Sequence, residues 1–355
     1  MRSSVTPFPP EHRRQGSVRA SVDGILATVG QTPLVRLRRQ YAEHDIDVWA
    51  KLESFNPTGS AKDRPAVRML QDAIALGEAG PGTTVIESSS GNLGVALARA
   101  CRFHGMRFIC VVDSRAPSIS VETIRALGAS VHVVTEPDPA TGDLLVARLA
   151  LVAQLLERTP GAFWPDQYAN PENPGAHAVG TMREIDEALD GAIDVVLVAT
   201  STAGTIAGCC DFLRANGRST RVIAVDAVGS ALFGGTRGPR KLPGFGAGIE
   251  TPLSRSVRHD HVVRVTDLDC VVGCRRLVAR EAIFAGASAG GVAVALAGLA
   301  PTLAPGTRCA IILHDGGTGY LRTVYDDAWV EAELGCGADE LAARVNSLQS
   351  PAPDA

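Results

Sequence analysis

The sequence contains almost no lysine. Its lysine and arginine residues total 34, yet only Lys51, Lys62 and Lys241 are lysines. Arginine stays protonated in proteins, so it cannot act as a nucleophilic or proton-accepting amine. A reaction that requires such an amine must therefore use one of these three residues.

The 355-residue chain also lacks a membrane-length apolar run, since charges interrupt every hydrophobic segment. The first 16 residues show no apolar stretch of the kind found in secretory signals. A net charge of -4 provides no basic field for nucleic acid or an anionic membrane. The eight cysteines are scattered, and none pairs with a second cysteine or histidine pair at zinc-ligand spacing. We therefore expect a cytoplasmic protein with no membrane, nucleic-acid or metal partner.

Apolar runs of strand length alternate with helical patterns along the chain. This alternation is typical of βαβ units, in which helices cover a parallel sheet. At 45% hydrophobic residues, the chain can fill the cores of two lobes. The sequence predicts an α/β fold with strands at 48–53, 83–87, 107–112, 130–134, 194–200, 221–226 and 308–314.

A first polar loop, Asn56 to Arg64, precedes a helical pattern and places Lys62 in the first turn of that helix. The helix dipole and the neighbouring Arg64 would both favour the neutral amine, which suits attack on a carbonyl. The alternative is a solvated surface lysine. Because lysine is so rare in this chain, a reactive amine and a surface lysine are about equally good interpretations of Lys62.

Two further loops also join a strand to a helix. Residues Glu87 to Gly94 contain three consecutive serines, and residues Ala199 to Thr205 contain four hydroxyl side chains among small residues. Exposed N–H groups and hydroxyls at a helix start bind carboxylates and phosphates. Each loop by itself is equally consistent with ordinary helix capping.

Together these three loops resemble the motifs of the fold-type II pyridoxal-phosphate (PLP) enzymes, the cysteine synthase and cystathionine β-synthase group. The chain matches the family's opening motif at Gly30 to Leu37 (GQTPLVRL) and its lysine motif at Asn56 to Arg64. It also matches the Ser-Gly-Asn motif at Ser90 to Asn92 and the phosphate loop at Ser201 to Thr205. The resemblance implies a tryptophan synthase β-like fold with two lobes, each holding a mostly parallel twisted sheet flanked by helices.

The resemblance also implies a homodimer, and the Pro-rich composition of the two ends and of residues 168–175 indicates the domain limits. We expect a flexible N-terminal arm at 1–23, a smaller mobile lobe at 56–169, a larger PLP-binding lobe at 24–55 plus 170–335, and a C-terminal tail at 336–355.

Carried over motif by motif, the resemblance assigns the site residues. Lys62 would be the catalytic Schiff-base lysine, Asn92 would bond the cofactor ring hydroxyl and Ser288 would face the ring nitrogen. The cofactor phosphate would be bound by Ser201, Thr202, Ala203, Gly204 and Thr205. The substrate would be bound by Ser89, Ser90, Gly91, Leu93, Gln167 and Tyr168. Arg115 is a candidate partner for a substrate phosphate on separate grounds, because arginine suits bidentate phosphate binding. We expect no metal.

Within the group, the chain most resembles the O-phosphoserine-dependent synthases that begin 2,3-diaminopropionate formation for siderophores and peptide antibiotics. That resemblance implies β-replacement joining O-phospho-L-serine and L-glutamate to N-(2-amino-2-carboxyethyl)-L-glutamate, with release of phosphate. Relative to cysteine synthases the chain has Tyr168 in place of Phe and Ser201 in place of Gly. The added phenol and hydroxyl fit a second substrate more polar than sulfide.

Three alternatives share part of this pattern. A cysteine synthase using O-acetylserine or O-phosphoserine and sulfide would carry the same motifs. A catalytically silent protein on this scaffold is disfavoured because the lysine and all three loops are intact. Residues Gly286 to Gly290 also match the Gly-x-Ser-x-Gly elbow of α/β-hydrolases, with Ser288 as nucleophile. The hydrolase elbow requires a strand directly before the serine, and the preceding residues instead predict a helix.

Overall fold

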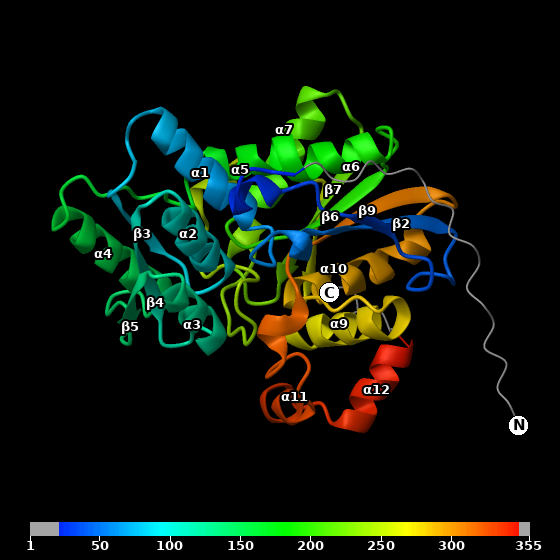
Figure 1. The fold of residues 1–355 in the computed structure, drawn as a ribbon. Coiled ribbons are helices and arrows are strands. Elements are labelled where there is room, and N and C mark those ends of the chain that lie inside the picture. The colour runs from blue at the N-terminus through cyan, green and yellow to red at the C-terminus, as the bar shows by residue number, and fades with distance from the viewer. Residues whose placement is uncertain (1–20, 348–355) are drawn as a thin grey trace, which may run out of the picture.

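The computed structural model describes residues 21–347, which form two lobes, each built on its own sheet (Figure 1). The larger sheet has six strands in the order β1-β2-β9-β6-β7-β8, and the smaller has three in the order β3-β4-β5. All neighbours pair in parallel except β1, which runs antiparallel to β2. The α/β architecture with two mostly parallel sheets is confirmed.

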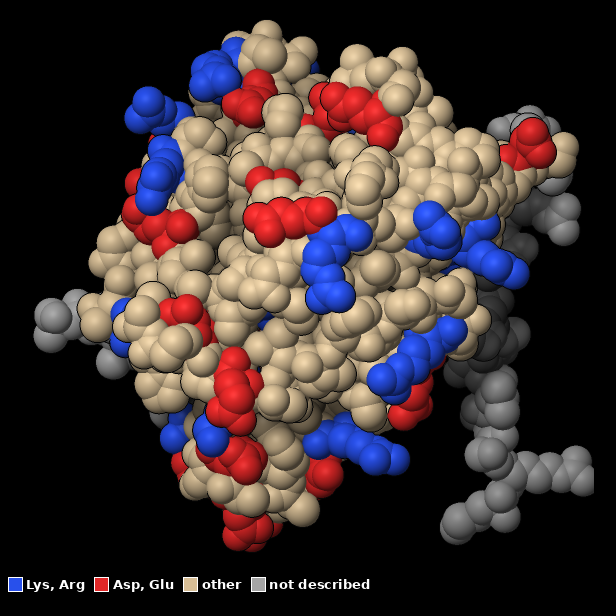
Figure 2. All heavy atoms as spheres, turned by 90° about the vertical axis from the view of Figure 1, so that its left-hand side faces the viewer, with Lys and Arg blue, Asp and Glu red and all other residues tan. Residues whose placement is uncertain are grey.

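The smaller sheet comprises β3 (Thr84–Ser88), β4 (Arg107–Asp113) and β5 (Ser130–Val134). Its helices are α1 (Asp63–Ala75), α2 (Asn92–Phe103), α3 (Ser118–Ala126) and α4 (Leu144–Glu157). Apolar residues of α1 and α2 pack with β3 and β4 in one buried cluster, so α1 belongs to the core of this lobe. Figure 2 looks onto this side of the molecule, where basic and acidic side chains both lie among broad uncharged areas.

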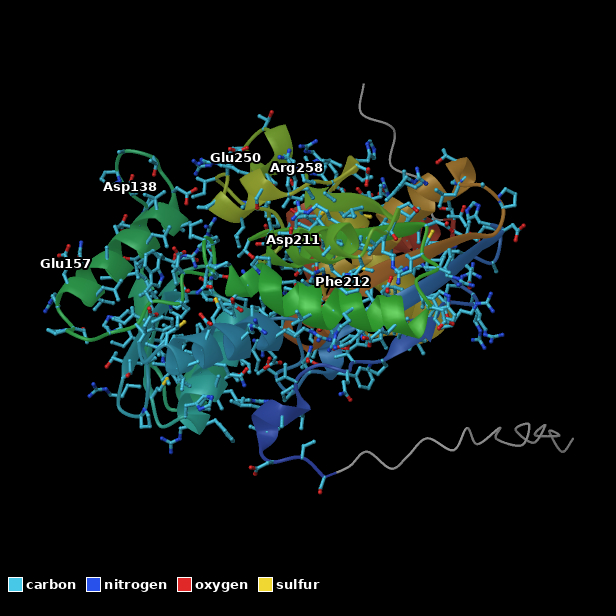
Figure 3. The ribbon with its side chains drawn as sticks, turned by 90° about the horizontal axis from the view of Figure 1, so that it is seen from above. Asp138, Glu157, Asp211, Phe212, Glu250 and Arg258 are labelled. Atoms are coloured by element: carbon cyan, nitrogen blue, oxygen red, sulfur yellow. The ribbon has the colours of Figure 1, made fainter. Side chains whose placement is uncertain are left out.

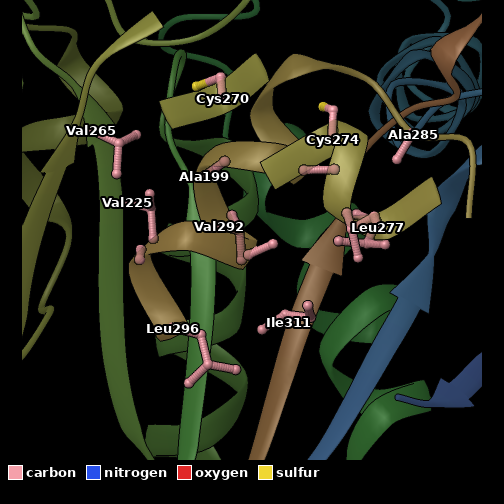
Figure 4. Close-up of a cluster of buried hydrophobic side chains, with 14 of the residues drawn as sticks. Ala199, Val225, Val265, Cys270, Cys274, Leu277, Ala285, Val292, Leu296 and Ile311 are labelled. Atoms are coloured by element: carbon pink, nitrogen blue, oxygen red, sulfur yellow. The ribbon is translucent and has the colours of Figure 1, made fainter. Parts of the chain in front are cut away.

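The larger sheet has helices on both faces. Its strands are β1 (Leu34–Arg36), β2 (Ile46–Leu52), β6 (Val195–Ala199), β7 (Arg221–Ala227), β8 (His261–Val265) and β9 (Thr307–Leu313). Ala199 of β6 packs with α9 (Asp267–Glu281) and α10 (Ala287–Leu299), as part of the cluster drawn in Figure 4. Val196 and Val198 of the same strand pack on the opposite face with α7 (Gly204–Ala215), which lies along the outside of this lobe and carries Asp211 and Phe212 (Figure 3). Burial on both faces explains why the central strands are continuous apolar runs.

Helices α9 and α10 approach each other closely through glycine. A Cβ atom at Gly273 would lie 2.1 Å from the carbonyl oxygen of Gly290, and one at Gly290 would lie 2.0 Å from that of Cys270. Backbone atoms fill the space that a side chain would need. This contact sets the position of the start of α10.

Short elements complete the described chain: α5 (Glu172–Ala176), α6 (Arg183–Ala188), α8 (Pro252–Ser256), α11 (Asp327–Leu334), α12 (Ala338–Ser347), a π-helical turn at His177–Met182, and 3-10 turns at Ile25–Thr28, Glu53–Phe55, Leu232–Gly234, Ala300–Thr302 and Gly317–Tyr320. None of the helices within residues 21–347 is long and apolar enough to cross a membrane.

All seven predicted strands correspond to strands in the structure, and two further strands, β1 and β8, were not expected from the sequence. The expected tail at 336–355 contains α12, which ends at Ser347. The expected arm at 1–23 lies almost wholly outside the described residues. The limits of the two lobes stay a prediction.

Candidate active site

A pocket lies where loops at the carboxyl ends of the strands meet the start of α10, the usual ligand position in an α/β fold. Its lining includes Lys62, Asn92, the loop Ser201–Thr205, and Ser288. Four segments that are far apart in the sequence are therefore brought together. The remaining lining residues are Ser60, Ala61, Ala199, Thr200, Gly244, His314, Asp315 and Tyr320.

Lys62 occupies the N-cap position of α1, and its side chain makes no capping hydrogen bond. Asp63 accepts hydrogen bonds from the backbone N–H and the hydroxyl of Thr58, at 2.9 and 2.6 Å, and so closes the loop that precedes the helix. The Ala61 N–H donates to the carbonyl oxygen of His314 at 2.7 Å. The lysine is thus fixed against the end of β9.

Burial lowers the pKa of Lys62 to about 8, and Asp315 opposes this effect. The cause differs from the one expected from the sequence. The Arg64 guanidinium is turned away toward Glu53 and Glu184, with N–O distances of 2.7 Å to each. Loss of hydration, rather than a neighbouring cation, therefore favours the neutral amine.

The other two lysines lie outside the pocket lining. Lys51 is buried and pairs with Glu184 at 2.7 Å. Lys241 is half exposed and pairs with Glu333 at 2.7 Å. Of the three lysines, Lys62 is therefore the one that lines the pocket.

The Ser201–Thr205 loop forms a polar cup at the start of α7. Ala203 adopts a left-handed backbone conformation with φ of 70°, and α7 begins at the next residue. Gly204 lies so close to Asn173 that an added Cβ would be 2.1 Å from its Oδ1 atom. The Thr205 hydroxyl lies 3.3 Å from Nε2 of His177. Backbone N–H groups and hydroxyls at a helix start suit a phosphate group.

Ser288 occupies the first turn of α10 and lines the pocket. An isolated bridge at Ala285, rather than a strand, precedes it within the described residues. The strand-to-serine turn of an α/β-hydrolase is therefore missing here, and the hydrolase alternative is wrong.

Among the pocket residues with no role assigned from the sequence, three have titratable side chains: His314, Asp315 and Tyr320. The Asp315 Oδ2 atom accepts hydrogen bonds from the Asn92 amide and the Tyr320 hydroxyl, both at 2.9 Å. Burial raises the pKa of Asp315, and it lowers the pKa of His314 to about 3. The Asp315 Oδ1 atom and both ring nitrogens of His314 are buried without a hydrogen-bond partner among the described residues. These atoms are free to bond a group that enters the pocket.

The serine loop forms a second group of polar residues on the smaller lobe. Ser89 Oγ accepts from the Gly94 N–H at 2.9 Å, and Ser90 Oγ accepts from Arg148 Nη1 at 2.8 Å. The Gln167 side-chain amide donates to the carbonyl oxygen of Ser88 at 2.8 Å. Of this loop, Asn92 reaches the pocket lining, whereas Ser89, Ser90 and Gly91 do not. Arg148 was missed because nothing in the sequence distinguishes it from the many other arginines.

Two expected substrate-binding residues lie elsewhere. Leu93 is buried in the apolar core of the smaller lobe. Arg115 has a side chain that is 71% exposed and pairs with Asp113 at 3.7 Å, away from the pocket lining. Tyr168 is half-buried, and burial raises the pKa of its hydroxyl to about 12, so it stays a neutral donor.

Comparison with known proteins identifies the family. The model of the family described as "Pyridoxal-phosphate dependent enzyme" matches residues 25–315. This chain is a pyridoxal-phosphate-dependent enzyme. Two curated relatives, from Ralstonia nicotianae and Cupriavidus metallidurans, are each named N-(2-amino-2-carboxyethyl)-L-glutamate synthase. The first is 45% identical and covers 86% of this chain and 90% of its own; the second is 42% identical and covers 87% and 91%.

Solved structures of the cysteine synthase-like group share the fold of this PLP enzyme. The O-acetylserine-dependent cystathionine β-synthase of Helicobacter pylori has a TM-score of 0.80 at 28% identity, covering 85% of this chain and 98% of its own. An O-ureido-L-serine synthase has a TM-score of 0.79 at 34% identity, covering 87% and 99%. The chain therefore has the fold-type II architecture.

The pocket fits pyridoxal phosphate on its own geometry. It joins a buried amine of lowered pKa at Lys62 to a polar cup at the start of α7. Unpartnered buried polar atoms of His314 and Asp315 complete the lining. A carbonyl-bearing, phosphorylated heteroaromatic group matches each of these features.

Proposed function

We propose that this enzyme joins O-phospho-L-serine and L-glutamate by β-replacement, giving N-(2-amino-2-carboxyethyl)-L-glutamate and phosphate. The observation that carries the proposal is the pair of relatives so named, which are 42 and 45% identical over most of the chain. Polar groups at the site suit acidic substrates, since Arg148 lies beside Ser90 and Ser201 lines the pocket. The product belongs on the route to L-2,3-diaminopropionate.

In this proposal Lys62 holds the cofactor, the cup Ser201–Thr205 holds its phosphate, Asn92 bonds its ring hydroxyl and Ser288 faces its ring nitrogen. When bound, pyridoxal phosphate supplies the electron sink that makes the Cα proton of an amino acid acidic. The Lys62 amine takes that proton as general base and later returns it. Its lowered pKa of about 8 keeps part of the amine neutral near physiological pH.

The substrate carboxylate is bound by Ser89, Ser90 and Gln167 in this proposal. Their segments lie on the smaller lobe and connect to the pocket through Asn92. Movement of the smaller lobe toward the cup would bring these carboxylate-binding residues and the amine of Lys62 to the same substrate molecule. It would also exclude water from the site.

The deciding assay incubates the purified enzyme with O-phosphoserine or O-acetylserine, then with glutamate or sulfide, and identifies the products by mass. We expect the glutamate conjugate and phosphate from the first donor. Efficient formation of cysteine from O-acetylserine and sulfide, with no glutamate conjugate, would instead establish a cysteine synthase.

We also propose that the enzyme is a cytoplasmic homodimer. Within the described residues all eight cysteines are buried and unpaired, which fits a reducing compartment. Exposed apolar side chains such as Phe55, Phe284 and Leu321 offer surface for a subunit contact. Light scattering of the purified protein should give twice the mass of the chain.

A further inference from the structure

A buried carboxylate lies directly beneath the serine loop. Glu87, the next-to-last residue of β3, has no exposed surface, and it forms no ion pair within the described part of the chain. Its hydrogen-bond partners within the described residues are three N–H donors. Oε1 accepts from the Ser88 N–H at 2.6 Å and from Nε1 of Trp164 at 3.4 Å, and Oε2 accepts from the Gln167 N–H at 3.1 Å. Burying a carboxylate without a cation is costly. A buried glutamate at this position is therefore explained best by what its oxygens do, which is to hold these donors in place.

The donors come from two separate segments that the proposed carboxylate site needs together. One is the end of β3 leading into Ser89 and Ser90, and the other is the segment from Trp164 to Gln167. Gln167 is held from both sides, because its backbone N–H bonds Glu87 and its side chain bonds the carbonyl oxygen of Ser88 at 2.8 Å. The two oxygens of Glu87 thus join the serine loop to Gln167.

We propose that Glu87 is a positioning residue that fixes the serine loop and Gln167 in one arrangement for gripping the carboxylate of the amino-acid substrate. This inference rests on the proposed assignment of Ser89, Ser90 and Gln167 to that carboxylate. Glu87 itself touches neither substrate nor cofactor. Its contribution is the fixed spacing between Ser88 and Gln167, which lie 79 positions apart in the sequence.

The charges around Glu87 agree with such a role. Burial raises its pKa to about 7, the hydrogen bonds from Ser88, Gln167 and Trp164 lower it, and Asp166 raises it further. The neighbouring cation, Arg148, is directed at Asp113 and Ser90 instead. Glu87 is therefore held in place by hydrogen-bond donors rather than by a salt bridge. Its removal is expected to change the positions of those donors and to leave no cation without a partner.

The test compares Glu87→Gln with Glu78→Gln, a matched change at an exposed glutamate of the same lobe. Glutamine keeps the size of the side chain but turns an N–H₂ group toward at least one N–H donor, so one segment loses its acceptor. We expect Glu87→Gln to raise KM for O-phosphoserine about tenfold or more while kcat changes less than threefold. The dissociation constant for the same amino acid, measured by the change in cofactor absorbance on binding, should rise in parallel.

Cofactor content and melting temperature separate positioning from folding. Both should stay near the wild-type values in Glu87→Gln, and Glu78→Gln should match wild type in every measurement. A double variant with Gln167→Ala should bind little worse than Gln167→Ala alone, because the two residues act through one contact. Should the glutamine variant be insoluble, Glu87→Asp, which keeps the charge but shortens the side chain, is expected to show an intermediate loss of affinity.

Unchanged affinity for the amino acid in Glu87→Gln or in Glu87→Asp would overturn the inference. A loss of affinity that is fully explained by loss of cofactor would also overturn it. Failure of the proposed function gives a different result. In that case O-phosphoserine does not change the cofactor absorbance of the wild-type enzyme, whereas another amino acid, such as O-acetylserine, does. The Glu87 variants are then compared with the wild type using that amino acid.

Discussion

At the scale of single residues, the scarcity of lysine gives a direct test of the site. Only Lys62 combines a position on the pocket with a pKa lowered by burial, whereas Lys51 and Lys241 are paired with carboxylates. Borohydride reduction of the holoenzyme followed by peptide mapping should place the pyridoxyl label on Lys62. Lys62→Ala should lose at least a thousandfold in turnover, on the order expected for removal of a nucleophile that is also the general base. A label on Lys51 or Lys241 would refute the assignment.

Ser288 offers a second test at this scale. A serine hydroxyl cannot stabilise a protonated ring nitrogen by charge, so the electrons at Cα are less delocalised and loss of the β-substituent is favoured. We expect Ser288→Asp to keep bound cofactor but to lose about a hundredfold or more in β-replacement rate. Ser288→Thr, which keeps a hydroxyl, serves as the control. Full activity in the aspartate variant would show that Ser288 does not face the ring nitrogen.

At the scale of elements, the contact between α9 and α10 positions the start of α10 and therefore Ser288. Because backbone atoms lie within 2.1 Å of the added Cβ at Gly273 and at Gly290, neither helix can accept a side chain without separating from the other. We expect Gly290→Ala to lower the free energy of unfolding by about 3 kcal/mol, the upper part of the range for overpacked sites. Gly80→Ala, where the added Cβ meets no atom within 4 Å, should change it by less than about 0.5 kcal/mol. Denaturant unfolding of the three proteins measures both values.

The elements also show how far the sequence could predict the structure. The central strands were predictable because burial on both faces makes them continuous apolar runs, as in β6. Strand β8 was not, since it is the last strand of its sheet and carries a charged residue, Arg264, within an otherwise apolar run. Lys62 and Asn92 were predictable from local motifs. Asp315 was not, because its contact with Asn92 joins positions 223 residues apart and depends on the packing of both lobes.

At the scale of the whole molecule, a buried ion network joins the lobes. Arg64, on a helix of the smaller lobe, contacts Glu184 at 2.7 Å, and Glu184 also contacts Lys51 of the larger sheet at 2.7 Å. Burial alone would raise the pKa of Glu184, but Arg64 and Lys51 together lower it to about 2. The carboxylate is thus ionised in the folded protein at pH values where the unfolded chain binds a proton. Its stabilisation is complete above the usual pKa of 4.5 and is lost as the pH falls toward 2.

We therefore expect Glu184→Gln to lower the free energy of unfolding at pH 7 by about 3 kcal/mol or more, since it leaves two buried cations short of a partner. The difference between this variant and the wild type should shrink between pH 4.5 and pH 2.5 in denaturant unfolding. A difference that stays constant over this range would mean that the pKa of Glu184 is not lowered in the folded protein.

A partly exposed ion pair, between Arg237 and the buried Asp143, also crosses between the lobes, and it should contribute less to stability. Arg237, on the loop after β7, contacts Asp143 at 2.8 Å, and its side chain is 47% exposed. Asp143 also caps α4 by accepting from the Leu145 N–H at 2.7 Å. Solvent weakens the ion pair but not the cap, so the two roles can be separated by substitution. Arg237→Ala and Asp143→Asn, which keeps an acceptor oxygen for the cap, should each lower the free energy of unfolding by less than about 1 kcal/mol. Asp143→Ala, which removes the cap as well, should lower it by about 1 kcal/mol more than Asp143→Asn does. Equal losses of unfolding free energy in Asp143→Asn and Asp143→Ala would show that the helix cap contributes nothing. The ion pair with Arg237 would then be the stabilising contact, and this part of the lobe boundary would contribute to stability alongside the buried network.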